Sequence, residues 1–450
     1  MCKKVMNVIH VKKVIIAIHE FTYSGTPLLA LEVAKILKEH EKEVYVISLQ
    51  DGELKKEFLD LGISVFFEDT MKQIPNADIL IAFSMLSFPV MEWMNYKLPI
   101  VCYIHEGEWL DRTLVDRKVR TVCGLKNEVW CVSEYARKYL ERRYNVKSLV
   151  QHNFVIDEYK KSNVNNNSQE IKKFLFIGSI NERKAPDIIV NAFKMLDLKE
   201  KQRCEVHFVG RTYLNYFSNS VIKEVEKENQ FIYHGEINKR EDILSLYSQM
   251  DVVIVPSLDE SCSLVTLEAM MMGIPVIISQ NVGAKYMVTR ECGWIFETGD
   301  VHVLYELLID IINNKYDLEA MGRNARESYL LNATKEIYEK EFIKKINHLV
   351  KIPSSLWKIK YLPNRLLWKF YYTYFYNPFE NESISRKSKV VLYGAGSNGV
   401  KWRNYLRHTK YVDVVAWVDK NVVRDEVIKL ENFQNIEYDY YLNYYIVLLI

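Results

Sequence analysis

The chain has 450 residues, a mass of 53.2 kDa and a formal net charge of +2. This length exceeds what one hydrophobic core usually holds, so two or three domains are expected. Hydrophobic residues make up 49% of the chain, which is enough for buried sheets. The near-neutral charge gives no electrostatic reason to expect binding to nucleic acid.

Cysteine usage and the lack of long apolar segments predict a cytoplasmic protein. The seven cysteines are scattered and include no C-x-x-C pair, a pattern typical of neither a zinc site nor a disulfide framework. The apolar run at 15–18 is far too short for a signal peptide, and no window approaches the roughly 20 apolar residues of a membrane-spanning helix. We expect a soluble protein and leave open a peripheral contact with the inner face of the cell membrane.

Strands and helices alternate from the beginning of the chain. The β-branched run 13–18 predicts a strand, 26–40 has the periodicity of a helix, and 43–49 is again a strand. Further strands are expected at 77–83, 99–105 and 128–133. Continuous apolar strands separated by helices indicate a parallel sheet covered on both faces, so residues 1–160 are predicted to form a Rossmann-like domain.

A second α/β domain, predicted to span residues 161–350, begins with a polar, Asn-rich linker that ends at residue 170. Its expected strands lie at 173–179, 204–210, 231–236, 251–257 and 275–279, and its expected helices at 186–196, 240–250, 264–273, 303–314 and 333–351. Two doubly wound domains bring the carboxyl ends of their strands to a shared cleft, which is the expected ligand site.

The end of the chain differs in composition. Residues 351–388 form a linker rich in basic and aromatic residues. Two interpretations stay open for it: contact with an anionic membrane surface, or packing against both lobes with its aromatic residues buried. A third α/β pattern occupies residues 389–450.

This third pattern contains a dinucleotide-binding fingerprint. Gly394, Gly396 and Gly399 fit G-x-G-x-x-G after an apolar strand, and Asp419 ends the next strand about 20 residues later, where an acid that binds ribose is expected. Only about 50 residues follow Gly399, too few for a complete dinucleotide-binding domain. We predict an incomplete Rossmann-like module, which resembles small modules attached to enzymes of polysaccharide synthesis, with NAD as a disfavoured cofactor.

Two glutamates stand in the otherwise largely uncharged stretch 256–277, and buried carboxylates are costly unless something pairs with them. The Asp and Ser residues after Pro256 are typical of a helix start, which places Glu260 on the loop and Glu268 two turns inside the helix. The free N–H groups of the first turn, near 261–265, then lie between them and favour an anion. Because carboxylates accept hydrogen bonds from paired hydroxyls, this order fits the sugar, diphosphate and ribose of a nucleotide-sugar.

The sequence ESCSLVTLE followed by AMMMGIPVI resembles the E-x7-E motif of the retaining glycosyltransferases of family 4, and the resemblance extends over residues 11–350. It implies a GT-B fold, in which two Rossmann-like domains face a cleft, the first on the acceptor side and the second binding the nucleotide-sugar. It implies that Glu260 is catalytic and that a group of nearby residues binds the donor: Ser261, Cys262, Ser263, Leu264, Val265 and Glu268. The alternative is an ordinary amphipathic helix whose glutamates face solvent.

Arg183 and Lys184 lie just after a strand and before a helix that begins at Pro186. The resemblance implies that these two catalytic cations contact the donor diphosphate, where fixed positive charge stabilises the departing group. Many family members have an arginine directly after the strand's glycine, whereas this chain has Ser179 after Gly178. We expect Arg183 to take over that role; the alternative is that both charges are simply solvated.

Three residues of the first domain complete the predicted site. Gly25 lies in a strand–helix loop where glycine lets the backbone approach a ligand. The resemblance places it beside the donor, although a plain turn is the alternative. His105 ends a strand, and the resemblance suggests that it is catalytic and touches the transferred sugar rather than being only structural. Glu106 is expected to meet the acceptor.

No D-x-D pair occurs, and the basic residues with the helix start are expected to balance the diphosphate, so we predict a metal-independent enzyme. The resemblance implies that the departing phosphate helps to deprotonate the acceptor hydroxyl. The leading hypothesis is transfer of a sugar from a nucleotide-sugar to a saccharide or lipid-linked acceptor in surface polysaccharide biosynthesis. The alternatives are an NAD-dependent nucleotide-sugar oxidoreductase or epimerase, and a non-catalytic nucleotide-sugar-binding subunit.

Overall fold

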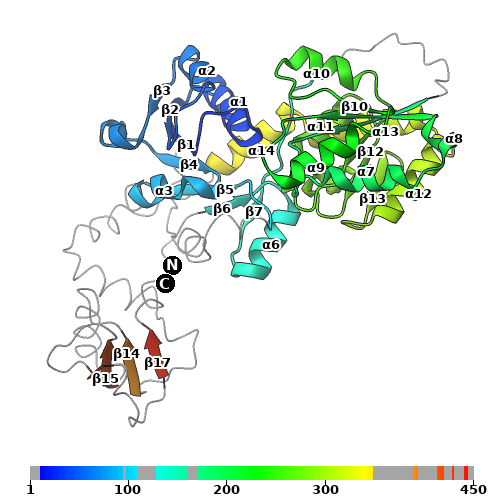
Figure 1. The fold of residues 1–450 in the computed structure, drawn as a ribbon. Coiled ribbons are helices and arrows are strands. Elements are labelled where there is room, and N and C mark those ends of the chain that lie inside the picture. Colours follow the sequence, from blue (N-terminus) through cyan, green and yellow to red (C-terminus); the bar gives the residue numbers. More distant parts are fainter. Residues whose placement is uncertain are drawn as a thin grey trace, which may run out of the picture. The chain divides into compact units, whose positions relative to one another are not determined.

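The computed structural model describes residues 11–94, 98–108, 128–159 and 171–347, together with four short strands between residues 389 and 443. These residues fall into two compact units. The first unit contains two large parallel sheets with their helices, and the second contains the four short strands (Figure 1).

The N-terminal lobe is built on a seven-stranded parallel sheet in the order β3-β2-β1-β4-β5-β6-β7. Its strands are β1 (Lys13–Ile18), β2 (Glu43–Ser48), β3 (Ser64–Phe66), β4 (Ile79–Phe83), β5 (Ile100–Ile104), β6 (Glu128–Cys131) and β7 (Leu149–Val150). The central strands β1, β4 and β5 are buried along almost their whole length, as expected for strands covered on both faces. The sequence pattern predicts every strand of this sheet except β3 and β7, which are too short to show an apolar strand pattern.

The helices of this lobe follow the expected alternation. They are α1 (Gly25–Glu39), α2 (Lys55–Asp60), α3 (Phe88–Met94) and α6 (Glu134–Tyr144), with 3-10 turns η1 (Glu68–Gln73) and η2 (Met85–Ser87). Helix α1 buries Leu29, Val33 and Leu37, which recur at helical spacing on one face. The hydroxyl of Ser133 caps α6 by accepting a hydrogen bond from the Ala136 N–H at 3.2 Å.

The C-terminal lobe contains a six-stranded parallel sheet in the order β10-β9-β8-β11-β12-β13. Its strands are β8 (Lys172–Ile177), β9 (Cys204–Val209), β10 (Phe231–Tyr233), β11 (Val252–Val255), β12 (Val276–Ser279) and β13 (Gly293–Phe296). Strand order reverses between β8 and β11, and ligands of open α/β sheets bind at the carboxyl ends beside such a reversal. The predicted pair of doubly wound α/β domains is therefore confirmed.

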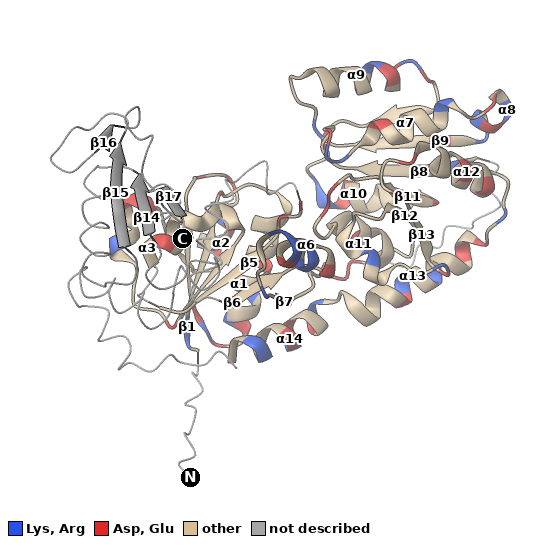
Figure 2. Cartoon of the chain, turned by 90° about the horizontal axis from the view of Figure 1, so that it is seen from below, with Lys and Arg blue, Asp and Glu red and all other residues tan. Residues whose placement is uncertain are grey.

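Helices cover both faces of this second sheet. They are α7 (Pro186–Lys194), α8 (Leu198–Lys201), α9 (Tyr216–Val225), α10 (Arg240–Tyr247), α11 (Leu264–Met271), α12 (Val301–Ile312) and α13 (Leu318–Asn332), with the 3-10 turn η3 (Gly283–Met287). Charged residues of both signs lie mainly on the helices and loops, while the strands are largely free of them (Figure 2). Within the described residues, no helix combines the length and apolar character needed to span a bilayer.

The last helix of the first unit, α14 (Lys335–Asn347), packs on the N-terminal lobe. Phe342 meets Trp130 of β6 edge to face, with ring centroids 5.8 Å apart. Lys345 donates to the carbonyl of Val150 at 2.6 Å, and Lys335 pairs with Glu39 of α1 at 2.7 Å. The chain thus crosses back after the second sheet, so the predicted segment 161–350 contributes its final helix to the first lobe.

The second unit is a four-stranded parallel sheet in the order β16-β15-β14-β17. Its strands are β14 (Lys389–Tyr393), β15 (Asp413–Asp419), β16 (Ile428–Lys429) and β17 (Tyr440–Asn443). Parallel pairing of β14 with both β15 and β17 is the arrangement expected of a Rossmann-like module. The predicted linker 351–388 lies outside the described residues.

Candidate functional site

The start of α11 is shaped by an unusual cap. Ser263 precedes the helix with a left-handed backbone conformation, φ 83°, and its hydroxyl accepts from the N–H of Thr266 at 3.2 Å. A non-glycine residue in this region costs about 1–3 kcal/mol, and such conformations cluster at functional sites. The described residues provide no acceptor for the N–H groups of Ser263, Leu264 and Val265. These donors at a helix start form the kind of site that binds an anion.

Glu260 lies beside this helix start and holds two cations. Its Oε2 accepts from Nη1 of Arg183 at 3.0 Å and from Nζ of Lys184. Burial alone would raise the pKa of Glu260, but Lys184 and Arg183 lower it to about 2. The structure thus brings these three predicted site residues together where β8 and β11 end, and their contact with a donor stays a prediction.

Glu268 is the fifth residue of α11, so it lies just over one turn inside the helix and not two turns as expected. One carboxylate oxygen accepts from the hydroxyl of the buried Tyr247 at 3.0 Å, and the other pairs with Arg240. Arg240 also pairs with Glu158 at 2.7 Å. The side chains of Glu260 and Glu268 are only 13% and 16% exposed, which excludes the alternative in which both face solvent.

The side chains of the two residues between Glu260 and the cap serve the fold. The Ser261 hydroxyl donates to the carbonyl of His105 in the N-terminal lobe, and its own carbonyl accepts from Ser133 at 2.5 Å. The Cys262 side chain is buried, and burial raises the pKa of its thiol to about 12. If Ser261 and Cys262 bind the donor as predicted, they are therefore expected to do so through backbone atoms.

His105 follows β5 directly, as predicted. Its ring stacks on Phe83 at 5.7 Å and lies 4.5 Å from the ring of Tyr103. Burial, with a smaller contribution from His19, lowers the pKa of His105 to about 3, so the ring is neutral at physiological pH. Its buried Nε2 has no hydrogen-bond partner among the described residues, which is unusual for a buried polar atom.

Glu106 is engaged within its own lobe. Its carboxylate accepts from the N–H groups of Met85 and His105, each at 3.1 Å, and from the hydroxyl of Ser84. Ser84 has a positive φ of 97° in the turn after β4. These contacts give Glu106 a role in holding that turn, and its contact with an acceptor stays a prediction.

Gly25 opens α1 and lies against α11 of the other lobe. A methyl group on Gly25 would come within 3.3 Å of Cδ1 of Leu264. The structure therefore brings the predicted glycine loop to the same helix start as the residues predicted to bind the donor. Its role at a donor remains a prediction.

Asp259 also belongs to this site, although the sequence analysis assigned it no role. It is an acidic residue that directly precedes Glu260. It is buried, and its Oδ1 accepts from the Tyr135 hydroxyl at 2.8 Å and from the Glu108 N–H at 3.0 Å, both in the N-terminal lobe. Its carbonyl accepts from Arg183 at 2.9 Å. This loop therefore links the two lobes at the site, a relationship that local pattern cannot reveal.

The fingerprint of the second unit is described only in part. Asp419 ends β15, which pairs with β14, as the fingerprint requires. Gly394, Gly396 and Gly399 lie outside the described residues. In the ranges that the structure describes, no three His, Cys, Asp or Glu residues gather as metal ligands, and metal independence stays a prediction.

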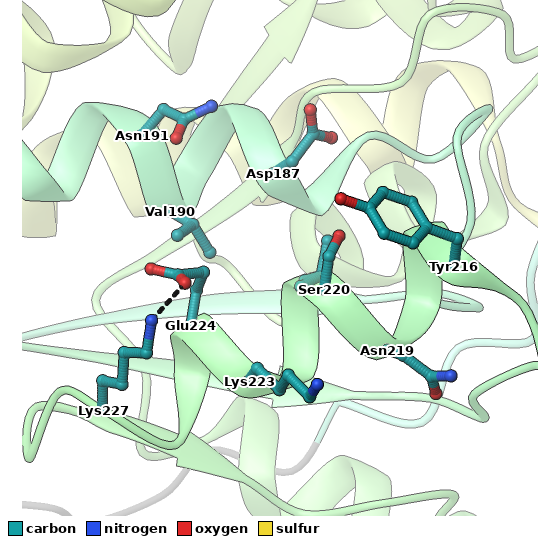
Figure 3. A pocket seen from close by; sticks show the side chains of 10 residues that line it. Asp187, Val190, Asn191, Tyr216, Asn219, Ser220, Lys223, Glu224 and Lys227 are labelled. Atoms are coloured by element: carbon teal, nitrogen blue, oxygen red, sulfur yellow. Dashed lines mark hydrogen bonds and ion pairs between the residues drawn. The ribbon is translucent and has the colours of Figure 1, made fainter.

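A separate pocket of about 470 Å³ lies between α7 and α9 of the C-terminal lobe (Figure 3). Asp187, Asn191, Tyr216 and Lys223 are among its lining residues. Burial raises the pKa of Asp187, and its Oδ1 has no partner among the described residues. None of the predicted donor-site residues line this pocket.

Solved structures with the same fold are numerous. Anabaena HepE in complex with UDP has a TM-score of 0.64 at 16% identity, with 75% of this chain and 100% of that chain covered. Sucrose-phosphate synthase from Thermosynechococcus elongatus has a TM-score of 0.62 at 14% identity, covering 74% and 98%. WaaG, a glycosyltransferase involved in lipopolysaccharide biosynthesis, has a TM-score of 0.56 at 15% identity, covering 73% and 98%. At these identities the similarity establishes the fold.

Two family models match overlapping parts of the chain. Glycosyl-transferase family 4 matches residues 10–177, and glycosyl transferases group 1 matches residues 157–328. Residues 10–328 are therefore similar to glycosyltransferases, and the chain has the GT-B fold.

The chain also has curated relatives of modest identity. It is 27% identical over 192 residues to an uncharacterised 41.2 kDa protein in the cps region of Klebsiella pneumoniae, covering 41% of this chain and 51% of that one. It is 33% identical over 87 residues to the capsular polysaccharide biosynthesis glycosyltransferase CapM of Staphylococcus aureus, covering 19% and 23%. The matches thus span about half or less of these relatives' own length.

Proposed function

We propose that this glycosyltransferase moves a sugar from a nucleoside-diphosphate-sugar to a saccharide or lipid-linked acceptor, with retention and without a metal. The proposal rests on the part-buried cluster of Glu260 with Arg183 and Lys184 beside the open N–H groups of α11. A carboxylate and cations at a helix start match the hydroxyls and the diphosphate of such a donor.

The proposed chemistry depends on electrostatics. As the glycosidic bond breaks, its electron pair goes to the diphosphate oxygen, and the growing charge is stabilised by Arg183, Lys184 and the N–H groups of Ser263 to Val265. The acceptor hydroxyl attacks the anomeric carbon from the same face and gives its proton to the departing phosphate. No side chain is required as a nucleophile.

His105 and Glu268 are proposed to position the donor. The neutral imidazole of His105 has a buried Nε2 without a partner among the described residues, and we propose that it bonds to a sugar hydroxyl once the donor is bound. Glu268 is held by Tyr247 and Arg240, so its carboxylate has a fixed direction when ribose hydroxyls approach. Fixed groups of this kind lose little freedom when the donor binds.

The names of similar proteins support a role in surface polysaccharide synthesis. HepE has been solved with UDP and with UDP-glucose, and CapM is named for capsular polysaccharide biosynthesis. We propose a nucleotide-sugar donor on this basis. The acceptor is proposed to be a growing saccharide or its lipid-linked form, and a peripheral membrane contact through residues 351–388 remains part of this proposal.

The test is release of nucleoside diphosphate from a panel of UDP-, GDP- and ADP-sugars by the purified chain, with and without a chelator. We expect turnover of at least one donor, unchanged by the chelator and lowered roughly 10- to 100-fold by Glu260→Gln, the cost of losing a charged hydrogen bond. The exposed Glu319 of α13 supplies a matched control, Glu319→Gln, with unchanged turnover. Binding without turnover would indicate a non-catalytic subunit, and oxidation or reduction of NAD by the chain would indicate an oxidoreductase.

A further inference from the structure

The cations of the proposed donor site are partly neutralised. Arg183 and Lys184 both bond to the carboxylate of Glu260, so these three side chains together contribute a single positive charge. A departing nucleoside diphosphate carries more negative charge than that. Because transition-state stabilisation depends on fixed charge at the departing group, a further cation at this edge of the sheet would complete the site.

Arg211 lies at this edge. It follows Gly210 at the end of β9, which is the sheet neighbour of β8. Gly210 has φ 143°, and a methyl group there would come within 2.0 Å of the Gly178 carbonyl oxygen, so the two strand ends touch. The Ile180 N–H donates to the Arg211 carbonyl at 2.9 Å. Arg211 is therefore next to Ser179, whose side chain is small and uncharged.

The guanidinium of Arg211 is directed along the same edge. Its Nε donates to the hydroxyl of Tyr213 at 3.3 Å, and that hydroxyl is 3.5 Å from Oγ of Ser179. Burial would raise the pKa of Tyr213, but Ser179, Arg211 and Arg183 lower it, so both arginines act on one phenol. Among the described residues, no carboxylate lies within ion-pair distance of Arg211. This exposed cation thus differs from Arg183 and Lys184, which share a counter-charge.

We propose that Arg211 is a third cation of the donor-diphosphate site. The proposal rests on the proposed function, because it assigns a further binding residue to the same site. The short side chain of Ser179 adds no charge at the end of β8, and the hydroxyl of Tyr213 links the guanidinium of Arg211 to Ser179. A planar guanidinium forms paired, charge-assisted hydrogen bonds to phosphate oxygens.

The experiment measures binding of UDP, GDP and ADP, and of their nucleosides, by isothermal titration calorimetry. We expect Arg211→Ala to weaken the best diphosphate about 10- to 100-fold, as loss of a charge-assisted hydrogen bond does, and to leave the nucleoside unchanged. The control is Arg290→Ala. Arg290 is an exposed arginine just before β13, at the amino end of the same parallel sheet. We expect the control to bind like the wild type.

A second variant tests whether charge at this edge is the cause. In the Arg211→Ala background, Ser179→Arg places a guanidinium on the adjacent strand end, and we expect diphosphate affinity to recover at least tenfold, about the value of one charged hydrogen bond. Thermal melting of each variant checks that it folds.

Three outcomes separate the two proposals. If the wild type binds none of the three diphosphates, the proposed function and this inference both fail. If Lys184→Ala weakens the diphosphate while Arg211→Ala does not, only the inference about Arg211 is overturned. The inference about Arg211 is also overturned if the double variant of Arg211→Ala and Ser179→Arg binds the diphosphate weakly while Ser179→Arg alone binds it like the wild type.

Discussion

Gly107 of the N-terminal lobe packs directly on the carboxylate of Asp259 in the C-terminal lobe, so that a methyl group in place of its hydrogen would come within 2.1 Å of Oδ1. Asp259 precedes Glu260, and its carbonyl holds Arg183. The contact between lobes and the proposed donor site therefore share one short loop. Any change that pushes Asp259 away is expected to move the Glu260 cluster as well.

The first prediction concerns this contact. Gly107→Ala should displace the loop of Asp259 and lower turnover at least about tenfold, because small misplacements of catalytic groups are costly. Tyr135→Phe removes one hydrogen bond to the same buried carboxylate without adding volume and should cost about 1–3 kcal/mol of stability with a smaller effect on turnover. Chemical denaturation and donor turnover measure both. Wild-type turnover in Gly107→Ala would refute the shared loop.

The second prediction concerns the orientation of Glu268. Tyr247→Phe removes a buried hydroxyl that donates to Glu268 and should lower both stability, by about 1–3 kcal/mol, and affinity for the nucleotide-sugar. Tyr329→Phe is the matched control, since it removes a buried hydroxyl that donates to the carbonyl of Val155 at 2.9 Å. The control should lose stability alone. Equal donor affinity in the two variants would argue against ribose binding by Glu268.

The third prediction uses the depressed pKa of His105. The pKa of His105 is about 3 in the folded protein, below its ordinary value of 6.5. Between these two pH values, His105 binds fewer protons in the folded protein than in the unfolded chain. Its contribution to stability is present above about pH 6.5 and is lost as the pH falls towards 3. His105→Gln should therefore show a shallower loss of unfolding free energy over this range, measured by denaturant titration. A slope equal to that of the wild type would show that His105 is not buried and neutral.

The fourth prediction concerns the ionisation of Glu260. Its folded pKa of about 2 lies below the ordinary value of 4.5, so its ion pairs stabilise the fold above about pH 4.5 and this contribution is lost as the pH falls towards 2. Glu260→Gln lacks this contribution and should lose less stability across that window. The same denaturant titrations at lower pH provide the measurement. Parallel curves for variant and wild type would place the carboxylate away from Lys184 and Arg183.

Much of this arrangement was predictable from local pattern. Apolar strands alternating with helices predict both sheets, because parallel strands are buried on both faces. The joint position of Glu260, Arg183 and Lys184 follows from their places after β11 and β8, which are neighbours at the reversal of strand order. The predicted helix 264–273 begins where α11 does, and the depth of Glu268 was overestimated because its fifth position lies only just over one turn inside that helix.

Contacts between distant segments were beyond sequence reasoning. Nothing local indicates that Asp259 meets Tyr135, that Ser261 bonds to His105, or that α14 returns to the first lobe. Such contacts depend on how the two lobes pack against each other, which the spacing of apolar residues along the chain does not indicate. Arg211 belongs to the same class, because its neighbour Ser179 is adjacent across two strands and not along the chain.

The central claim is that Glu260, Arg183 and Lys184 hold the diphosphate of an activated sugar. The most direct measurement is the affinity of Lys184→Ala for the preferred nucleoside diphosphate and for its nucleoside, by titration calorimetry. The account predicts a roughly 10- to 100-fold loss for the diphosphate and no change for the nucleoside, since only the phosphate charge is affected. Equal affinities of variant and wild type for the diphosphate would contradict it.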